Sequence, residues 1–257
     1  MKLIITAPRG KMAGLIVADA AGRDDVEIIA GVGPEGRDYI GRDIGEAAMI
    51  GRSVGAPVVD DIESVIDEAD VVCDFSTTEL GMEVLDSCIR HGKTLVVGTT
   101  GFSAEQRAKL EAASETIPIM IAANTDRMVN IMRKLLMDAA RELYDTTDIE
   151  IVDMHDNTKL DAPSGTAREL IESMGDAVGR DLVSDAVYCR PLGRIPREKG
   201  KVTFHAIRGG DTPSSHTVYF FADGERLEIT HHCLNWKGCA RGAVDACIWM
   251  EIGRAHV

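Results

Sequence analysis

The chain has 257 residues, enough for one large domain or two smaller ones with a substantial buried core. Its formal net charge of −14 at pH 7 argues against a nucleic-acid or anionic-membrane partner, because like charges repel. Hydrophobic residues make up 45% of the chain without a continuous apolar run of membrane-spanning length, so we expect a globular protein that does not cross a membrane.

The first half alternates short apolar runs with amphipathic segments, the pattern of a parallel sheet covered by helices. The expected strands are residues 2–6, 27–32, 71–75, 94–98 and 117–122. The expected helices are residues 12–21, 62–68, 79–91, 104–115 and 128–143. Each expected strand ends in small or polar residues, and such carboxyl ends line the ligand crevice of an open parallel sheet. The pattern therefore predicts a Rossmann-type domain.

The turn between the first strand and the first helix is the expected phosphate site of such a sheet. It contains only Gly10 and Gly14 as glycines, and Pro8 lacks a backbone N–H donor. Arg9 and Lys11 place two cations at the start of the helix, which still favours an anion. On this turn alone, a connection that binds no dinucleotide remains an equal alternative.

A different pattern begins after Asp148, where most segments alternate apolar and polar residues. The expected strands are residues 149–153, 187–190, 202–208, 217–223 and 225–231. The expected helix at 166–178 has Thr166 and Glu169 at capping-box spacing. This pattern predicts a mixed or antiparallel sheet with one face open for subunit contact. A last expected helix, residues 242–249, packs back on the first domain, and residues 253–257 have the character of a frayed end.

The predicted fold is therefore α/β, with an N-terminal Rossmann-type parallel sheet and a C-terminal α+β mixed-sheet domain. We expect residues 1–124, completed by 235–257, to bind dinucleotide, and residues 125–234 to bind substrate and form the oligomer. The six cysteines include no C-x-x-C pair, which favours reduced thiols in a cytoplasmic protein. His231 and His232 have no third ligand at suitable spacing, so we expect no metal site.

The most informative stretch is residues 154–166, which connects an expected strand to an expected helix. It carries one imidazole, His155, and one ammonium, Lys159, four residues apart. His155 is the group in this loop that can exchange a proton near neutral pH without a large pKa shift. The composition is also compatible with a solvated loop that ends in an ordinary helix cap.

The helix that follows this loop offers a seat for an acidic group. Gly165 lets the backbone approach a ligand, and the first N–H groups of the helix point outward. A carboxylate there would meet N–H donors, the hydroxyl of Ser164 or Thr166 and the charge of Lys159. The sequence thus predicts a small-molecule carboxylate as substrate.

At these residues the chain resembles the dihydrodipicolinate reductase family. It matches the family signature at His155, Lys159 and residues 161–167. Further matches, in the order of the family, are residues 74–76, 97–102, 122–124, 148–151, 208–211, 216–217 and 224–231. The matches extend over nearly the whole chain.

The resemblance implies a cytoplasmic enzyme of lysine biosynthesis that forms a homo-oligomer, either a tetramer or a dimer, and reduces a cyclic imine carboxylate with NADH or NADPH. It implies that His155 supplies or orients the proton and that Lys159 holds or polarises the substrate. The implied substrate contacts are Thr100, Asp156, Ser164, Gly165, Thr166 and Trp236. The implied cofactor contacts are Arg9, Gly10, Lys11, Met12, Phe75, Ser76, Gly98, Thr100, Ala122 and Asn124.

Departures from the family pattern cluster at ligand contacts. Asp156 stands in place of a second adjacent histidine, and Trp236 in place of an arginine that grips substrate. Ala7 and Ala13 replace glycines of the phosphate turn, and Gly33-Pro34 replaces the Glu-Arg region that contacts adenosine. Because Asp156 would repel a dicarboxylate, a substrate with one carboxylate and one cationic or amino group is a second hypothesis.

Two other functions remain open at this point. One is a lyase or isomerase that uses His155 and Lys159 as acid and base without redox turnover, which the altered phosphate turn favours. The other is a catalytically silent relative with a binding or regulatory role, which the retained His155 and Lys159 argue against.

Overall fold

The computed structural model describes residues 1–190 and 192–251. These residues form two compact units, one of Met1–Asp126 together with the chain from Trp236 onward, the other of Arg127–Asn235. Residues 253–257, for which the sequence suggests a frayed end, lie outside the described residues. None of the described helices combines the length and the apolar character that crossing a membrane requires.

The first unit contains a six-stranded sheet in the order β3-β2-β1-β4-β5-β6, with every neighbouring pair parallel. Its strands are β1 (Lys2–Thr6), β2 (Glu27–Val32), β3 (Val58–Val59), β4 (Val71–Asp74), β5 (Thr94–Val97) and β6 (Ile119–Ile121). The order reverses between β1 and β4, and at such a switch point the carboxyl ends of the strands open a crevice. The predicted Rossmann-type sheet is confirmed; the short β3 is an addition to it.

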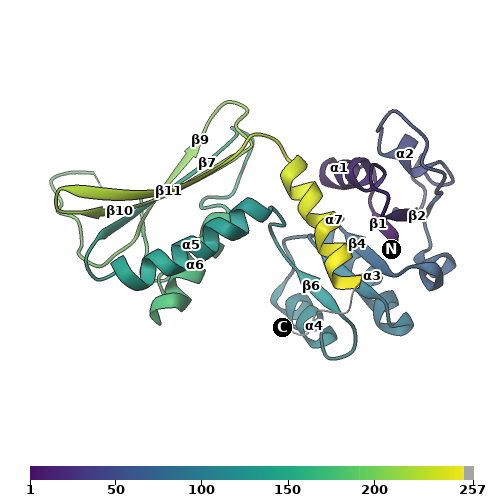
Figure 1. Ribbon diagram of the computed structural model, residues 1–257, viewed down its shortest axis with the longest axis horizontal. Coiled ribbons are helices and arrows are strands. Elements are labelled where there is room, and N and C mark those ends of the chain that lie inside the picture. The colour runs from purple at the N-terminus through teal and green to yellow at the C-terminus, as the bar shows by residue number, and fades with distance from the viewer. Residues whose placement is uncertain (191, 252–257) are drawn as a thin grey trace. The chain divides into compact units, whose positions relative to one another are not determined.

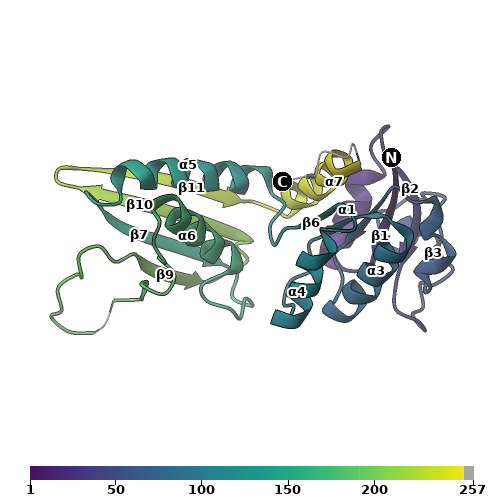
Figure 2. The ribbon, with the colours of Figure 1, turned by 90° about the horizontal axis from the view of Figure 1, so that it is seen from below.

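Helices cover both faces of this sheet (Figure 2). They are α1 (Lys11–Ala20), α2 (Ile44–Ala47), α3 (Thr78–His91), α4 (Ala104–Ala113) and α7 (Lys237–Glu251). One apolar core joins α1 and α7 to the sheet, and a second joins α3 and α4 to its other face. The predicted C-terminal helix is thus confirmed, longer than expected, and packs against α1, β4 and β5.

The helix predicted at residues 62–68 is wrong. Two short 3-10 turns occupy this segment, η1 (Ile62–Ser64) and η2 (Ile66–Glu68). They are separated at Val65, whose φ of −133° lies outside the helical region. Ile62 and Ile66 are both buried in the core, as their four-residue spacing predicts, but the break at Val65 divides the segment into two single turns.

The second unit contains a mixed five-stranded sheet in the order β11-β10-β7-β9-β8. Its strands are β7 (Asp148–His155), β8 (Val187–Tyr188), β9 (Thr203–Arg208), β10 (Ser214–Ala222) and β11 (Glu225–Cys233). Strand β7 pairs antiparallel with β10 and parallel with β9. Two helices, α5 (Arg127–Leu143) and α6 (Gly165–Val178), cover one face and share an apolar core with it (Figure 1). The predicted mixed sheet is confirmed, and no helix of the described residues covers its other face.

The capping box predicted from Thr166 and Glu169 is wrong. Helix α6 begins at Gly165, and its N-cap is Ser164, whose hydroxyl accepts a hydrogen bond from the Ala167 N–H at 3.1 Å. The cap lies two residues earlier than the sequence spacing suggests because a tertiary contact holds Ser164: its own N–H donates to the Asp153 carboxylate at 2.7 Å.

Candidate active site

The carboxyl ends of three strands in the first unit meet at Asp74, a fully buried carboxylate at the end of β4. It accepts hydrogen bonds from the hydroxyls of Thr6 at 2.8 Å, Thr99 at 2.6 Å and Ser76. Burial raises the pKa of Asp74, while the three hydroxyl donors act in the opposite direction. Asp74 thereby holds the turns after β1, β4 and β5 together. Asp74 lies in the matched segment 74–76 but was not among the predicted cofactor contacts, although a carboxylate at the end of a buried strand was a usable signal.

Gly98, directly after β5, lies against the ring of Phe75. A Cβ at Gly98 would lie 2.1 Å from the Phe75 Cζ atom, so glycine lets the ring rest on the backbone. The Ala122 N–H donates to the Val97 carbonyl at 2.9 Å, which places the end of β6 beside the same edge. Three predicted cofactor residues, Phe75, Gly98 and Ala122, are thus gathered there by the ends of neighbouring strands.

Other predicted contacts have different partners in this unit. The Asn124 amide oxygen accepts from the Asp126 N–H at 2.9 Å, so it helps shape the segment after β6. Thr100 is exposed in the loop after β5. Trp236 is partly buried, and the Lys11 ammonium lies 5.4 Å from the centre of its ring, a cation–π contact.

In the phosphate turn, the backbone of Ala7 adopts a conformation that favours glycine. This residue has a φ of +46°, a left-handed conformation that glycine adopts without strain. The Gly10 N–H donates to the Ala7 carbonyl at 2.8 Å, and Gly10 is the N-cap of α1. Gly10 offers no side-chain cap, and no acidic residue lies in the first turn of α1. The amide groups here, with Lys11 at the start of the helix, therefore suit an anion such as a pyrophosphate.

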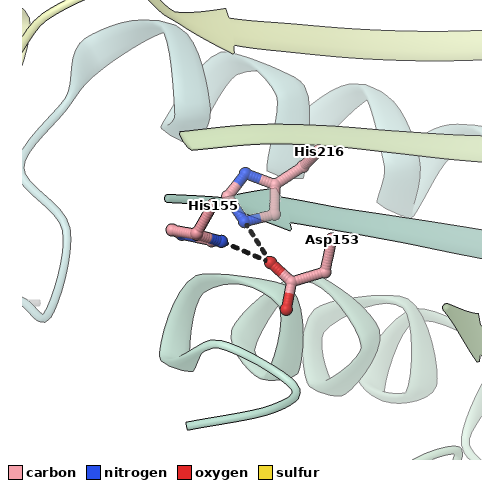
Figure 3. A group of neighbouring side chains, drawn as sticks. All are labelled: Asp153, His155 and His216. Atoms are coloured by element: carbon pink, nitrogen blue, oxygen red, sulfur yellow. Dashed lines mark ion pairs between the residues drawn. The ribbon is translucent and has the colours of Figure 1, made fainter. Parts of the chain in front are cut away.

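In the second unit, three buried side chains gather on the face of the sheet that α5 and α6 cover: Asp153, His155 and His216 (Figure 3). Asp153 and His155 are two residues apart on β7 and so share a face, and His216 on β10 is paired with Asp153 across the strands. The Asp153 Oδ1 atom lies 2.9 Å from His155 Nδ1 and 3.4 Å from His216 Nε2. The 2.9 Å contact is an ion pair rather than an aligned hydrogen bond.

The other carboxylate oxygen of Asp153 accepts from the Ser164 N–H at 2.7 Å and from Arg208 Nη2 at 3.0 Å. Burial acts to raise the pKa of Asp153, but its contacts with His155, His216, Ser164 and Arg208 outweigh burial and hold that pKa well below its usual range. Asp153 is therefore ionised at neutral pH. One charge thus links the predicted proton donor to the start of α6.

The atoms Asp153 Oδ1, His155 Nδ1 and His216 Nε2 lie within 4.8 Å of one another, a spacing at which a metal ion could bind. The same carboxylate is already neutralised by the guanidinium of Arg208, and His216 Nε2 lies 3.2 Å from the Ser164 hydroxyl. We therefore interpret the cluster as an arrangement that orients the His155 ring. Sequence reasoning missed Asp153, His216 and Arg208; the last two lie in matched family segments, but nothing local assigned them to His155.

Lys159 and Asp156 make contacts within their own loop. The Lys159 ammonium lies 2.8 Å from the Asp161 carboxylate, and its side chain is 26% exposed. The Asp156 carboxylate accepts from the Thr158 N–H at 2.8 Å. The loop is also tied to the β9–β10 turn, since Gly209 N–H donates to the His155 carbonyl at 3.0 Å.

The start of α6 provides an open backbone surface. Nothing lies within 4 Å of a Cβ built at Gly165, so a ligand has room beside the first amide groups of the helix. The Ser164 side chain is buried and caps the helix, whereas Thr166 is half-buried. The structure thus brings His155 and the start of α6 together through Asp153.

Fold and site define a class of two-unit enzyme with a Rossmann-type first unit and a sheet-based second unit that carries a buried acid–histidine pair. The solved structure of a putative myo-inositol dehydrogenase from Sinorhizobium meliloti has a TM-score of 0.62 at 14% identity, covering 100% of this chain and 90% of that chain, a likeness of fold alone. Two family models match the chain: dihydrodipicolinate reductase, N-terminus, over residues 1–125, and dihydrodipicolinate reductase, C-terminus, over residues 128–257. The chain belongs to the dihydrodipicolinate reductase family.

Individual relatives agree. A 4-hydroxy-tetrahydrodipicolinate reductase from Pseudomonas fluorescens is 40% identical over 251 residues, 97% of this chain and 93% of the relative. One from Alkalilimnicola ehrlichii is 41% identical over 249 residues, with coverage of 97% and 93%. The dipicolinate-bound dihydrodipicolinate reductase from a Paenisporosarcina species has a TM-score of 0.75 at 24% identity, covering 98% and 95%. The predicted family and oxidoreductase class are confirmed, and the lyase alternative gains no support from these relatives.

Proposed function

We propose that this protein uses NADH or NADPH to reduce a small cyclic imine carboxylate of the 4-hydroxy-tetrahydrodipicolinate type, as a step of lysine biosynthesis. The single observation that carries the proposal is the buried pair of Asp153 and His155, 2.9 Å apart, whose acid also holds the N-cap of α6. That arrangement links a proton donor to a site for a carboxylate, which are the two parts that reduction of an imine acid requires besides the hydride of the cofactor.

The proton is assigned to His155. Its Nδ1 faces the ionised Asp153, which favours a proton on that nitrogen. The opposite ring nitrogen, Nε2, is then the atom that would donate to the substrate. His216 contacts the same Asp153 oxygen and packs edge-on against His155, with ring centres 5.3 Å apart, so it restrains the orientation of the His155 ring.

The substrate carboxylate is assigned to the first amide groups of α6, where Gly165 leaves room. Lys159 would contribute a positive charge that is only partly neutralised, because its partner Asp161 is half exposed to solvent. In the first unit, the residues fit a nicotinamide dinucleotide. The turn before α1 suits its pyrophosphate, and the edge formed by Phe75, Gly98 and Ala122 would receive its ring. When bound, the reduced nicotinamide would supply the hydride.

The test is a steady-state assay of NADH and NADPH oxidation with freshly generated 4-hydroxy-tetrahydrodipicolinate. We expect oxidation that requires both substrate and cofactor. Asp156→His should raise kcat/KM by at least tenfold, because it removes a carboxylate whose repulsion of an anion is worth about 4 kcal/mol at 4 Å and an effective dielectric near 20. No turnover in either protein would reject this substrate. If activity instead required an amino-bearing monocarboxylate, the second substrate hypothesis would replace it.

We further propose that copies of this chain associate through the uncovered face of the second sheet. That face carries Val152 and Met154 on β7, Ile207 on β9, and the stacked rings of Tyr219 and Phe221 on β10. Light scattering during size-exclusion chromatography should give a mass of two or four chains, and Tyr219→Lys should lower it. A monomeric wild-type protein would contradict this proposal. None of the six cysteines forms a disulfide, which supports a location in the reducing cytoplasm.

A further inference from the structure

The carboxyl end of β2 has an arrangement that bears on which cofactor is used. Gly33 follows the strand, and a Cβ there would lie 2.6 Å from the Tyr39 Cε2 atom. The buried Tyr39 ring therefore fills the space where a side chain at Gly33 would begin. The next residue, Pro34, has no side-chain acceptor or backbone N–H. This strand end offers no carboxylate at the position directly after β2.

A cation stands beside that strand end instead. The Arg9 guanidinium, from the phosphate turn, lies 5.4 Å from the centre of the Tyr39 ring. Its Nη2 atom is 3.6 Å from the Asp38 carboxylate, and the two side chains are 40% and 69% exposed. An exposed pair at this distance is weak, so the guanidinium remains available to a stronger anion. Tyr39 and Asp38 together keep Arg9 over the end of β2.

We propose that Arg9 makes this enzyme prefer NADPH to NADH by binding the 2′-phosphate of the adenosine ribose. The inference rests on the proposed nicotinamide cofactor. In sheets of this type the ribose lies beyond the second strand, where an acid accepts hydrogen bonds from a 2′-hydroxyl and an arginine accommodates a 2′-phosphate. A guanidinium forms paired, charge-assisted hydrogen bonds with phosphate, whereas a neutral hydroxyl gains little from it.

Asp38 is the group that could reverse this preference, because its carboxylate could accept from the 2′-hydroxyl of NADH. The Asp38 carboxylate already faces Arg9, so the 2′-hydroxyl of NADH would compete with Arg9 for it. The 2′-phosphate of NADPH would instead take the place of the Asp38 carboxylate beside Arg9. Asp38 therefore lowers the affinity for NADPH without removing the preference. Glu35 is exposed on the same loop and makes the local field less favourable to phosphate in the same way.

The experiment is a set of equilibrium titrations of the intact protein by calorimetry. NADPH and NADH are compared first, then adenosine 2′,5′-bisphosphate and AMP, which lack the nicotinamide. We expect NADPH to bind at least tenfold more tightly than NADH. The bisphosphate should likewise bind at least tenfold more tightly than AMP. Arg9→Ala should raise the Kd for NADPH at least tenfold and change the Kd for NADH by less than twofold. Asp38→Asn should lower the Kd for NADPH.

Lys11→Ala is the matched control, because it removes another cation of the same turn. Since Lys11 lies against Trp236 rather than Tyr39, its loss should raise the Kd for NADH and for NADPH by similar factors. Equal wild-type affinity for NADH and NADPH, or equal weakening of both by Arg9→Ala, would overturn the inference and leave the proposed function intact. Failure of both cofactors to bind would overturn the two together.

Discussion

Replacing His155 by glutamine should lower kcat by roughly 100-fold to 10,000-fold, the range by which a positioned proton donor accelerates reactions. The reason is that Nδ1 of His155 faces the ionised Asp153, which leaves the opposite nitrogen to serve the substrate. Glutamine keeps a polar side chain in the pocket but cannot exchange a proton near neutral pH. Steady-state kinetics should show the loss in kcat, and titration should show an unchanged Kd for the cofactor.

His216→Gln is the matched control for this experiment. His216 is also buried and contacts the same Asp153 oxygen, but it lies one strand away and is assigned only the orientation of His155. We expect it to lower kcat by less than His155→Gln does. If the two variants lost the same activity, or if His155→Gln retained wild-type kcat, the assignment of the proton to His155 would be incorrect.

Replacing Asp153 by asparagine should lower the free energy of unfolding of the second unit by about 3 kcal/mol, because breaking a buried ion pair leaves its partner uncompensated. The partner here is Arg208, 3.0 Å away and with a side chain only 17% exposed. Denaturant unfolding of wild type and variant measures the difference. Asp148→Asn is the control: Asp148 is on the same strand and pairs with Arg197 at 2.9 Å, but it is 51% exposed, so its loss should cost less than about 1 kcal/mol.

The Asp153 contribution should also depend on pH. Because its pKa is lowered in the folded protein, the stabilisation is complete above the unfolded pKa of aspartate, about 3.9, and is lost as pH falls from there toward the folded pKa. The difference in unfolding free energy between wild type and Asp153→Asn should therefore be constant near neutral pH and shrink below about pH 4. A difference that stayed constant under acid would show that Asp153 is not the ionised group described here.

The fold could be predicted largely from local pattern. Apolar residues at steps of two or of three and four identified the main strands and the longer helices, because an element that buries one face must repeat at its own period. The segment at 62–68 was the exception. There the spacing of Ile62 and Ile66 suits one face of a helix and both are buried, but this spacing does not show the break at Val65.

By itself, the sequence identified the loop with His155 and Lys159, the glycine at the start of α6 and the cations of the phosphate turn, because each signal lies within a few neighbouring residues. The environment of each group depended on strand pairing. Register between β7 and β10 brings His216 to Asp153, and the parallel pairing of β7 and β9 brings Arg208 there. Likewise, Asp74 meets Thr6 and Thr99 only where strands β1, β4 and β5 end side by side. Contacts between residues far apart along the chain are formed only when the sheets assemble, so tertiary structure alone decided which acid faces His155 and which side chains lie beside Arg9.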